Sequence, residues 1–284
     1  MHRLPIFSLA LAALLLQACA SAPKDRAVGI ASTQTLETIR DDSYAKAERY
    51  LDVEAVRSAA RVGLPRVALA DGALGEGISA AQGALVANQA ARQVCTNLAP
   101  FLRFDEAAAE LAIELQVTAI RPTSSGASGV SAVLGVFVPG PFRLPAGLGG
   151  FAADGVARRG GEDVLVLRWA EGASALGDDA KISSIGDAYQ LASQFADDFT
   201  GNLIDPQGKD GERRPRLESA LVAANKTLCE ARFGKANIAG RGVSLLLPLS
   251  PEAIDSGAPD SAANGAGVDA DQAVEPAKTE EPSE

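Results

Sequence analysis

Apolar and polar side chains alternate along several short stretches of the chain, most clearly between residues 111 and 119. Every second residue there is apolar, and Glu114, Gln116 and Thr118 stand between the apolar ones. A period of two predicts a β-strand with one buried face. The same alternation at residues 49–55 predicts a first strand. The apolar runs 164–169 and 243–249 predict a later and a final strand, with Glu171-Gly172 as a turn into a short return strand.

Apolar residues spaced by three and four positions predict three helices, each with one apolar stripe that faces the core. The first covers residues 78–98 and is interrupted near Asn88, the second begins at Asp187, and the third covers residues 217–228. Their stripes are Ile78, Ala81, Leu85, Ala91, Cys95 and Leu98; Leu191, Phe195, Phe199 and Leu203; and Leu217, Leu221, Ala224 and Leu228.

This order of elements predicts an α+β fold, with a mainly antiparallel or mixed sheet and helices packed on one face. Residues 123–150 are rich in glycine, serine and proline around an apolar run at residues 130–138. That segment is either a long hairpin or a mobile flap. We expect one domain at residues 44–250, preceded by a tether and followed by a tail.

The N-terminus has the pattern of a bacterial export signal. Met1-His2-Arg3 precedes an apolar run that is too short to cross a bilayer, and Leu16-Gln17-Ala18-Cys19 follows. This sequence resembles the bacterial lipobox, which implies cleavage after residue 18 and acylation of Cys19. The alternative is an ordinary secretory signal with an incidental cysteine.

Acylation of Cys19 would make the membrane a partner of the chain. One acyl chain binds a bilayer only marginally, so the three chains implied by the lipobox are needed for lasting attachment. Ala20 stands where inner-membrane retention usually uses aspartate, which favours the periplasmic face of the outer membrane. Residues 19–43 are expected to form a lipidated, disordered tether.

Two cysteines remain besides Cys19. An oxidising compartment favours a disulfide between Cys95 and Cys229, and two separately buried thiols are the alternative. Neither cysteine has a Cys-x-x-Cys companion, which argues against a redox centre or a zinc knuckle.

From residue 251 onward the chain lacks aromatic residues and leucine, and it is rich in small and acidic residues. Such a segment cannot bury enough apolar area to offset its ordering entropy, so residues 251–284 are expected to be a disordered acidic tail. The tail holds nearly all of the formal net charge of −10. This charge argues against nucleic acid as a partner. The tail is either a solubilising segment or an acidic docking segment.

Several of these patterns together carry a resemblance: ELAIELQVTAIRP at residues 110–122, GGF at 149–151, VLVLRW at 164–169, DAY at 187–189 and FA at 195–196. The stretch from residue 44 to residue 205 resembles an uncharacterised family of Gram-negative lipoproteins that have a lipobox and one periplasmic α/β domain. The resemblance implies a scaffolding or partner-binding role and brings no catalytic residues with it.

The residues present exclude many kinds of catalytic site. The only histidine, His2, lies in the export signal, so no imidazole remains for a Ser-His-Asp site or a histidine-ligated zinc. Ser43 and Lys46 have a Ser-x-x-Lys spacing, but no second motif of the penicillin-binding enzymes follows. We predict no catalytic residue, no metal site and no cofactor.

Other polar groups are expected to be ordinary surface. Adjacent residues point in different directions, so the pairs Asp41-Asp42, Asp178-Asp179 and Asp197-Asp198 are expected to be solvated. The basic residues between 209 and 216 are either a soluble turn or a contact for lipid head groups or an acidic partner. Trp169 is expected in the core, with an interface anchor as the alternative.

Two functions remain open at this point. The first is a non-catalytic envelope lipoprotein that binds or scaffolds another envelope protein. The second is a carboxylate-based enzyme or a ligand-binding lipoprotein that acts on cell-wall or lipid material, with residues 123–150 as a lid. A pocket with converging polar groups would favour the second, and an exposed apolar patch or sheet edge would favour the first.

Overall fold

The computed structural model describes residues 21–24, 26–123, 148–173, 183–208, 213–236, 250–255 and 257–258. Its centre is a mixed six-stranded sheet with the order β1-β2-β8-β7-β6-β4, in which only β4 and β6 are parallel neighbours. The strands are β1 (Glu37–Asp41), β2 (Ala45–Leu51), β4 (Arg66–Leu69), β6 (Ala112–Arg121), β7 (Gly150–Arg159) and β8 (Glu162–Gly172).

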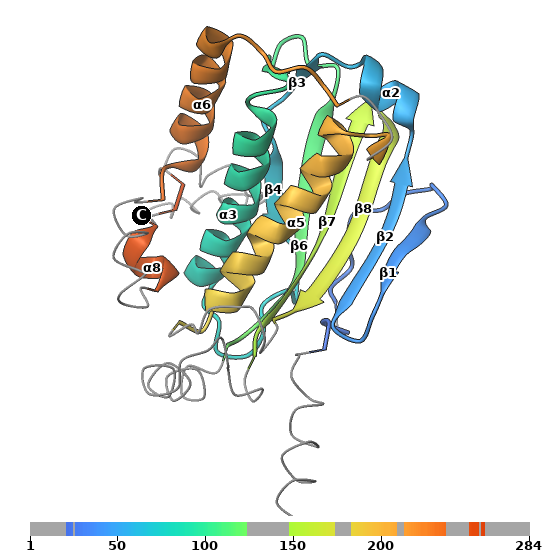
Figure 1. Ribbon diagram of the computed structural model, residues 1–284. Helices are drawn as coiled ribbons and strands as arrows, with labels where there is room; N and C mark the ends of the chain where they lie inside the picture. The colour runs from blue at the N-terminus through green and yellow to red at the C-terminus, as the bar shows by residue number, and fades with distance from the viewer. Residues whose placement is uncertain are drawn as a thin grey trace, which may run out of the picture.

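Helices cover one face of this sheet, which confirms the α+β fold class. The helices α3 and α5 lie side by side on the sheet, and α6 flanks α3 on the side away from α5 (Figure 1). A separate two-stranded parallel pair, β3 (Arg61–Val62) with β5 (Arg103–Phe104), adjoins the main sheet, because β3 is bridged to Leu111, the residue before β6. The helices are α2 (Val53–Ser58), α3 (Ala80–Leu98), α5 (Gly186–Ile204), α6 (Ser219–Phe233) and α8 (Pro251–Ile254).

Most of the strongly periodic segments form the predicted elements. The alternating run at residues 111–119 is β6, the run at 164–169 is the middle of β8, and the first two predicted helices are α3 and α5. The helix α3 begins with a capping box, in which the Ser79 and Gln82 side chains each accept a hydrogen bond from the other residue's backbone N–H. The predicted strand at 243–249 and most of the segment 123–150 lie outside the described residues.

Two element predictions need correction, and one long strand was missed. The first strand ends at Leu51, because Asp52 accepts a hydrogen bond from the Ala55 N–H and caps α2. Glu171-Gly172 is the end of β8 and not a turn, because it pairs with Gly150 and Phe151 of β7. Strand β7 itself was not predicted. It forms a hairpin with β8 through Gly160 and Gly161, whose φ angles are 59° and 91°.

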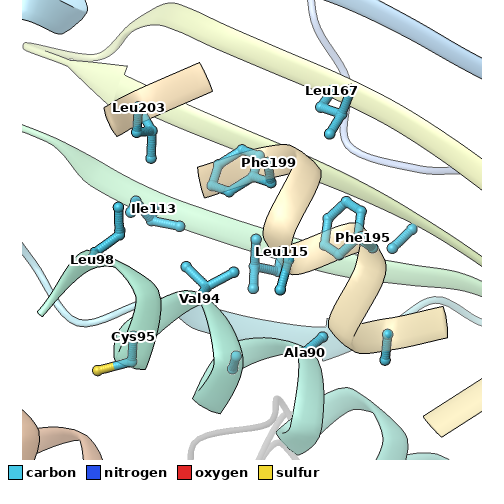
Figure 2. Packing of buried hydrophobic residues seen from close by; sticks show 14 of the residues in the cluster. Ala90, Val94, Cys95, Leu98, Ile113, Leu115, Leu167, Phe195, Phe199 and Leu203 are labelled. Carbon is cyan, nitrogen blue, oxygen red and sulfur yellow. The ribbon is translucent and has the colours of Figure 1, made fainter. Parts of the chain in front are cut away.

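The core lies between the sheet and the helices α3 and α5. Side chains of α3, such as Val94 and Leu98, and of α5, such as Phe195 and Phe199, converge there with side chains of β6 and β8 (Figure 2). Trp169 belongs to this core, since it is 1% exposed and its indole ring meets Phe195 edge-on. Gly155 lets α5 approach the sheet, because a Cβ there would stand 2.6 Å from the Phe199 ring.

The opposite face of the sheet is crossed by the N-terminal arm, which we define as residues 21–34. The Ala27 N–H donates to the carbonyl of Thr118, and Arg26 pairs with the buried Asp154 at 2.9 Å. The chain then forms β1, which pairs with β2. The domain boundary expected at residue 44 therefore moves back to residue 21, because the arm and β1 pack on the sheet.

The boundary expected at residue 250 also moves. Asp255, which follows α8, is 4% exposed and accepts hydrogen bonds from Arg92 of α3 and from the hydroxyl of Tyr189 of α5. Glu252 accepts hydrogen bonds from Gln82 and Ser183. The start of the predicted tail is therefore part of the body, and the residues after 258 lie outside the described ranges.

Candidate partner-binding site

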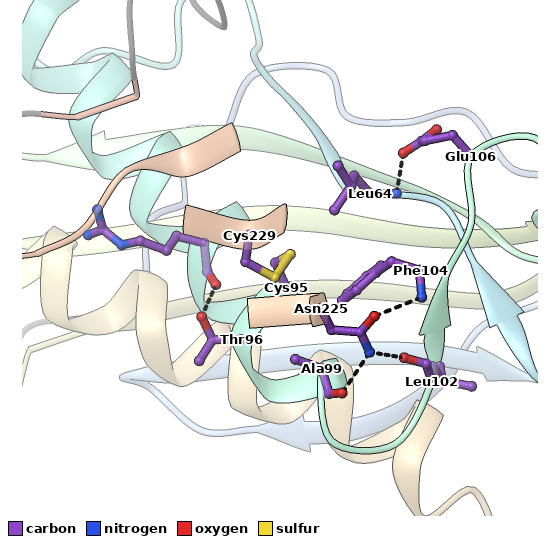
Figure 3. The surroundings of a disulfide bond; sticks show 10 residues. Leu64, Cys95, Thr96, Ala99, Leu102, Phe104, Glu106, Asn225 and Cys229 are labelled. Atoms are coloured by element: carbon purple, nitrogen blue, oxygen red, sulfur yellow. Dashed lines mark hydrogen bonds between the residues drawn. A yellow bond between two sulfur atoms is a disulfide. The ribbon is translucent and has the colours of Figure 1, made fainter. Parts of the chain in front are cut away.

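The helix α6 is attached to the body by a disulfide. Cys95 of α3 and Cys229 of α6 are bonded, with 5.8 Å between their Cα atoms and 134 positions between them in the sequence (Figure 3). Both residues are buried. Of the two possibilities that the sequence left open for these cysteines, the structure has the disulfide.

A single amide side chain makes the second attachment. The Asn225 side-chain nitrogen donates to the carbonyls of Ala99 and Leu102, both at 2.8 Å, and its oxygen accepts from the Phe104 N–H at 3.3 Å (Figure 3). Asn225 is only 3% exposed. These bonds satisfy backbone groups at the end of α3 and the start of β5, and Asn225 thereby sets how α6 is rotated about its axis.

The C-terminal end of α6 makes the third attachment. Phe233 is 3% exposed, and its carbonyl accepts a hydrogen bond from the side chain of Asn88 at 2.9 Å. Asn88, which interrupts the predicted stripe of α3, is thus buried as a partner of α6. The buried face of α6 consists of Asn225, Cys229 and Phe233.

The predicted apolar stripe of α6 lies outside this buried face. Leu221 is 37% exposed and Leu228 is 44% exposed, and Ala224 between them is also exposed. Leu217, just before the helix, is half-buried. The expectation that this stripe faces the core is therefore wrong, because the disulfide and Asn225 turn a different face inward. We call Leu221, Ala224 and Leu228 the leucine face.

The segment that carries the leucine face is basic in an acidic chain. Residues 213–236 hold six basic and two acidic side chains, a net charge of +4, although the whole chain has −10. Arg213 and Arg216 stand over the Phe101 ring, 4.9 and 5.5 Å from its centroid. The described part of the basic loop thus packs against the body beside the start of α6.

Arg214 has a different role from its neighbours. Its guanidinium donates to the carbonyls of Leu203, Ala59 and Val56, and burial lowers its pKa. It fixes the chain between α5 and α6 to the body. Lys209, the first residue of the predicted basic loop, lies outside the described residues.

A buried polar cluster joins α3, α5 and the end of α8. Arg92 donates to Asp255, to Gln89 and to the Tyr189 hydroxyl. Burial alone would raise the pKa of Asp255, but hydrogen bonds from Arg92 and Tyr189 outweigh it and hold the pKa below its ordinary value. Burial and the hydrogen bond to Asp255 raise the pKa of Tyr189. Each polar group in this cluster has a partner within it, and we call Arg92, Tyr189 and Asp255 the C-terminal latch.

Asp154 is the second buried carboxylate. Burial raises its pKa above the ordinary value, although the charges of Arg26 and Arg168 oppose this effect. It faces the N-terminal arm, and a Cβ added at Gly29 would collide with its carboxylate. Asp154 therefore acts as the attachment point of the arm.

A polar groove of about 720 Å³ opens beside the β7–β8 turn. Its charged walls are paired within the fold: Arg158 binds Glu114 and Asp163, and Arg159 binds the Ala55 carbonyl and the Ser58 hydroxyl. It is lined by Ala31, Ser32, Thr33, Gln34, Tyr50, Asp52, Ala55, Arg158, Arg159, Gly161, Glu162, Asp163 and Val164. These ion pairs and hydrogen bonds fix part of the wall of the groove, which has a mainly polar surface.

The remaining predicted residues are dispersed. Cys19 lies outside the described residues. Lys46 pairs with Asp41 and not with Ser43, and the Ser43 carbonyl accepts from the Ala22 N–H. Asp198 accepts a hydrogen bond from the Trp169 indole at 2.8 Å. Of the predicted site residues that the structure describes, Cys95 and Cys229 are brought together.

Two further observations concern the described residues only. Among them, no group of three or more histidine, cysteine, aspartate or glutamate side chains is placed to hold a metal ion. None of the described helices has the length and apolar character needed to cross a bilayer.

No family model matches the chain, and no curated protein matches it. Among solved structures, the chain is similar to the PelC dodecamer from Paraburkholderia phytofirmans, seen in two crystal forms, one of them of a point variant. Each PelC structure is 10% identical to this chain, and each match covers 56% of this chain and 96% of the PelC chain. The TM-score is 0.35, and it is 0.34 for the variant. No property of PelC is transferred to this chain.

Proposed function

We propose that this chain is a lipid-anchored envelope protein of a Gram-negative bacterium that uses α6 to bind another envelope protein. It is anchored through Cys19, faces the periplasm from the outer membrane, and acts by binding rather than by catalysis. The observation that carries the proposal is the leucine face of α6, which stays exposed because a disulfide and a buried amide fix the helix in that rotation.

The free energy that Leu221 and Leu228 would gain on burial favours a role for them in binding a partner. Leu221 and Leu228 are 37% and 44% exposed, so covering the rest of each side chain would gain about 0.5–1.3 kcal/mol. Rotating α6 to bury them would expose Phe233, which is 3% exposed. The Cys95–Cys229 bond and the three hydrogen bonds of Asn225 oppose that rotation. A partner that covers Leu221 and Leu228 would recover this burial.

The charge around α6 defines the partner's chemistry. Arg214 binds backbone carbonyls of the body and Lys235 pairs with Glu230, so the positive charge offered to a partner comes from the other basic residues, Arg213, Arg216, Lys226 and Arg232. These favour a partner with acidic residues around an apolar strip, such as an acidic amphipathic helix. The lipobox pattern and the disulfide both support an exported chain, because disulfides persist in the periplasm.

The binding surface can be tested by crosslinking in intact cells. A photoreactive amino acid at Leu228 should capture one envelope protein, and the Leu221→Glu/Leu228→Glu pair should abolish the co-purification of that protein without unfolding the domain. Ala223→Glu is the matched control, since Ala223 is exposed on the other side of the same helix. Equal capture from position 223 would contradict a specific leucine face.

The anchor is tested separately. The Cys19→Ser variant should lose its acyl chains, as read from the mass of the N-terminal peptide, and should leave the outer-membrane fraction. The anchoring would be overturned if the Cys19→Ser variant stayed in the outer-membrane fraction and the N-terminal peptide of the parent carried no acyl mass.

A further inference from the structure

We infer that one end of the sheet, where β2 and β7 begin and β6 and β8 end, rests directly on the lipid surface. This inference depends on the proposed anchor at Cys19, and it concerns the orientation of the body on the membrane. We call this the anchor end and define it by Ser21, Tyr44, Arg121, Gly150 and Gly172.

The strand ends meet there by register. Gly150 pairs with Gly172 on one side and with Arg121 on the other, and Ala45 pairs with Glu171. The Gly172 N–H donates to the Tyr44 carbonyl at 2.8 Å. Four strands therefore end or begin in one layer, which forms the lower end of the sheet in Figure 1.

The arm is fixed to this layer from its first described residue. Arg121 donates to the Ser21 carbonyl at 2.7 Å, and the Ala22 N–H donates to the Ser43 carbonyl at 3.0 Å. Ala22 is 3% exposed, and a Cβ at Gly150 would stand 3.2 Å from the Pro23 ring. The arm thus begins as a packed part of the anchor end.

Contacts further along prevent the arm from lengthening the tether. The Ala27 N–H donates to the Thr118 carbonyl at 2.9 Å, and Arg26 pairs with Asp154, which is 1% exposed. Release of the arm would break this ion pair and the hydrogen bond between Ala27 and Thr118. The chain between the lipid and the body therefore stays short.

Its length follows from the sequence. Only Ala20 separates Cys19 from Ser21. Two Cα–Cα steps of about 3.8 Å span at most roughly 8 Å. The polar headgroup layer on each side of a bilayer is about 5–8 Å thick. An acylated Cys19 would therefore hold Ser21 at the membrane surface.

The anchor end also has an aromatic residue suited to this position. Tyr44 is 39% exposed, and tyrosine is favoured where an apolar ring meets lipid and a hydroxyl meets water. The ends of two long connections also lie at this end of the sheet. One connection is flanked by Thr123 and Leu148, and the other by Ala173 and Ser183. The Thr123 N–H donates to the Ser184 carbonyl, and the Ala173 N–H donates to the Gly149 carbonyl.

The opposite end of the sheet then points into the periplasm. Strand β7 has ten residues, and at roughly 3.3 Å per residue it spans about 30 Å. The Gly160–Gly161 turn and the polar groove beside it lie at this far end. The helix α6 runs alongside α3 on the flank of the body (Figure 1), and Leu221 and Leu228 on it are exposed. A partner would reach α6 from the side, across the membrane surface.

Depth-dependent quenching tests the orientation. Asp42→Cys and Glu162→Cys are both exposed positions, one beside the anchor end and one at the far end, and each can be labelled with a thiol-reactive dye while the disulfide remains oxidised. The protein purified from membranes is placed in phosphatidylethanolamine vesicles that carry a headgroup quencher. Quenching at position 42 should exceed that at position 162 by at least about threefold, because a label some 30 Å away is beyond the quencher's reach.

Equal quenching at both positions, or stronger quenching at position 162, would overturn the orientation. The mass of the N-terminal peptide separates this outcome from failure of the proposed function. Acyl chains with equal quenching contradict only the orientation, whereas their absence contradicts the anchor and, with it, the orientation.

A linker variant tests whether the packed arm sets the orientation. Ten glycine and serine residues inserted between Ala20 and Ser21 should lower quenching at position 42 to the level at position 162, with the acyl chains still present. Unchanged quenching would contradict the role of the short arm.

Discussion

At the scale of single residues, Asn225 decides which face of α6 turns inward. Its one side chain serves two carbonyls and one backbone N–H, and all three belong to the connection between α3 and β5. A buried amide in this position could not be predicted from an apolar stripe. The pattern correctly placed the leucines of α6 on one stripe of the helix. The hydrogen bonds of Asn225 turn that stripe toward solvent and not toward the core.

The Asn225→Ala variant should lose about 2–4 kcal/mol of unfolding free energy, because buried carbonyls and a buried N–H are left without partners. Urea unfolding followed by Trp169 fluorescence measures this loss. Thr227→Ala is the control on the same helix, since Thr227 is exposed, and it should change the free energy by less than about 0.5 kcal/mol. Similar losses for the two variants would contradict the role given to Asn225.

At the scale of elements, the sequence predicted those whose two faces differ. Strand β6 and the helices α3 and α5 show clear periods, because their large apolar side chains are concentrated on the side that packs on the core. Strand β7 was missed because its first eight residues are all buried, between α5 on one face and the arm on the other. A strand that is buried on both faces does not alternate between apolar and polar residues, so its sequence lacks the period that predicts a strand.

The disulfide is the main link between α6 and the rest of the fold. The Cys95→Ser/Cys229→Ser variant should lose about 4–5 kcal/mol in the chain-entropy model for a loop of more than 100 residues. Hydrogen exchange should show the loss first in α6, whose exposed leucines add little packing of their own, while β6, β7 and β8 stay protected.

The matched control for this variant is the reduced parent protein, which keeps both sulfur atoms and lacks only the bond. It should show the same loss of protection in α6. Uniform loss across the sheet would mean that the bond stabilises the whole domain rather than this helix.

At the scale of the whole molecule, distant segments complete the body. The arm closes one face of the sheet, and Asp255 closes the junction of α3 and α5. Neither could be predicted, because both segments have the composition of tethers and are held by ion pairs and hydrogen bonds to distant residues, among them Arg26–Asp154 and Arg92–Asp255. The fold class could be predicted, since it depends on periodicity, whereas the count of thiols left the Cys95–Cys229 disulfide as one of two possibilities.

The C-terminal latch makes stability depend on pH. The pKa of Asp255 is held below its ordinary value in the folded protein, so the unfolded chain binds the proton more readily. The latch therefore contributes fully above about pH 4 and is lost as the pH falls through the folded pKa. Asp255→Asn should cost about 3 kcal/mol at pH 7, because the Arg92 charge stays buried and unpaired.

Urea midpoints of the parent and of Asp255→Asn, measured from pH 7 to pH 3, check this dependence. The difference between them should be constant down to about pH 5 and should shrink below about pH 4. Asp154, whose pKa is raised by burial, acts in the opposite direction and is present in both proteins, so it cancels from the difference. A gap that is unchanged at pH 3 would contradict the latch.

The crosslink between α3 and α6 also carries information about timing. Its sulfur atoms are separated by 134 positions in the sequence, and the intervening chain contains β6, the β7–β8 hairpin and α5. In a chain that is exported from its N-terminus, the second thiol reaches the oxidising side only after all of these segments have crossed. If the chain is exported as proposed, this disulfide can form only after the strands β6 to β8 and α5 have crossed, so the leucine face would be fixed in place late in export, with residues 230–284 still to follow.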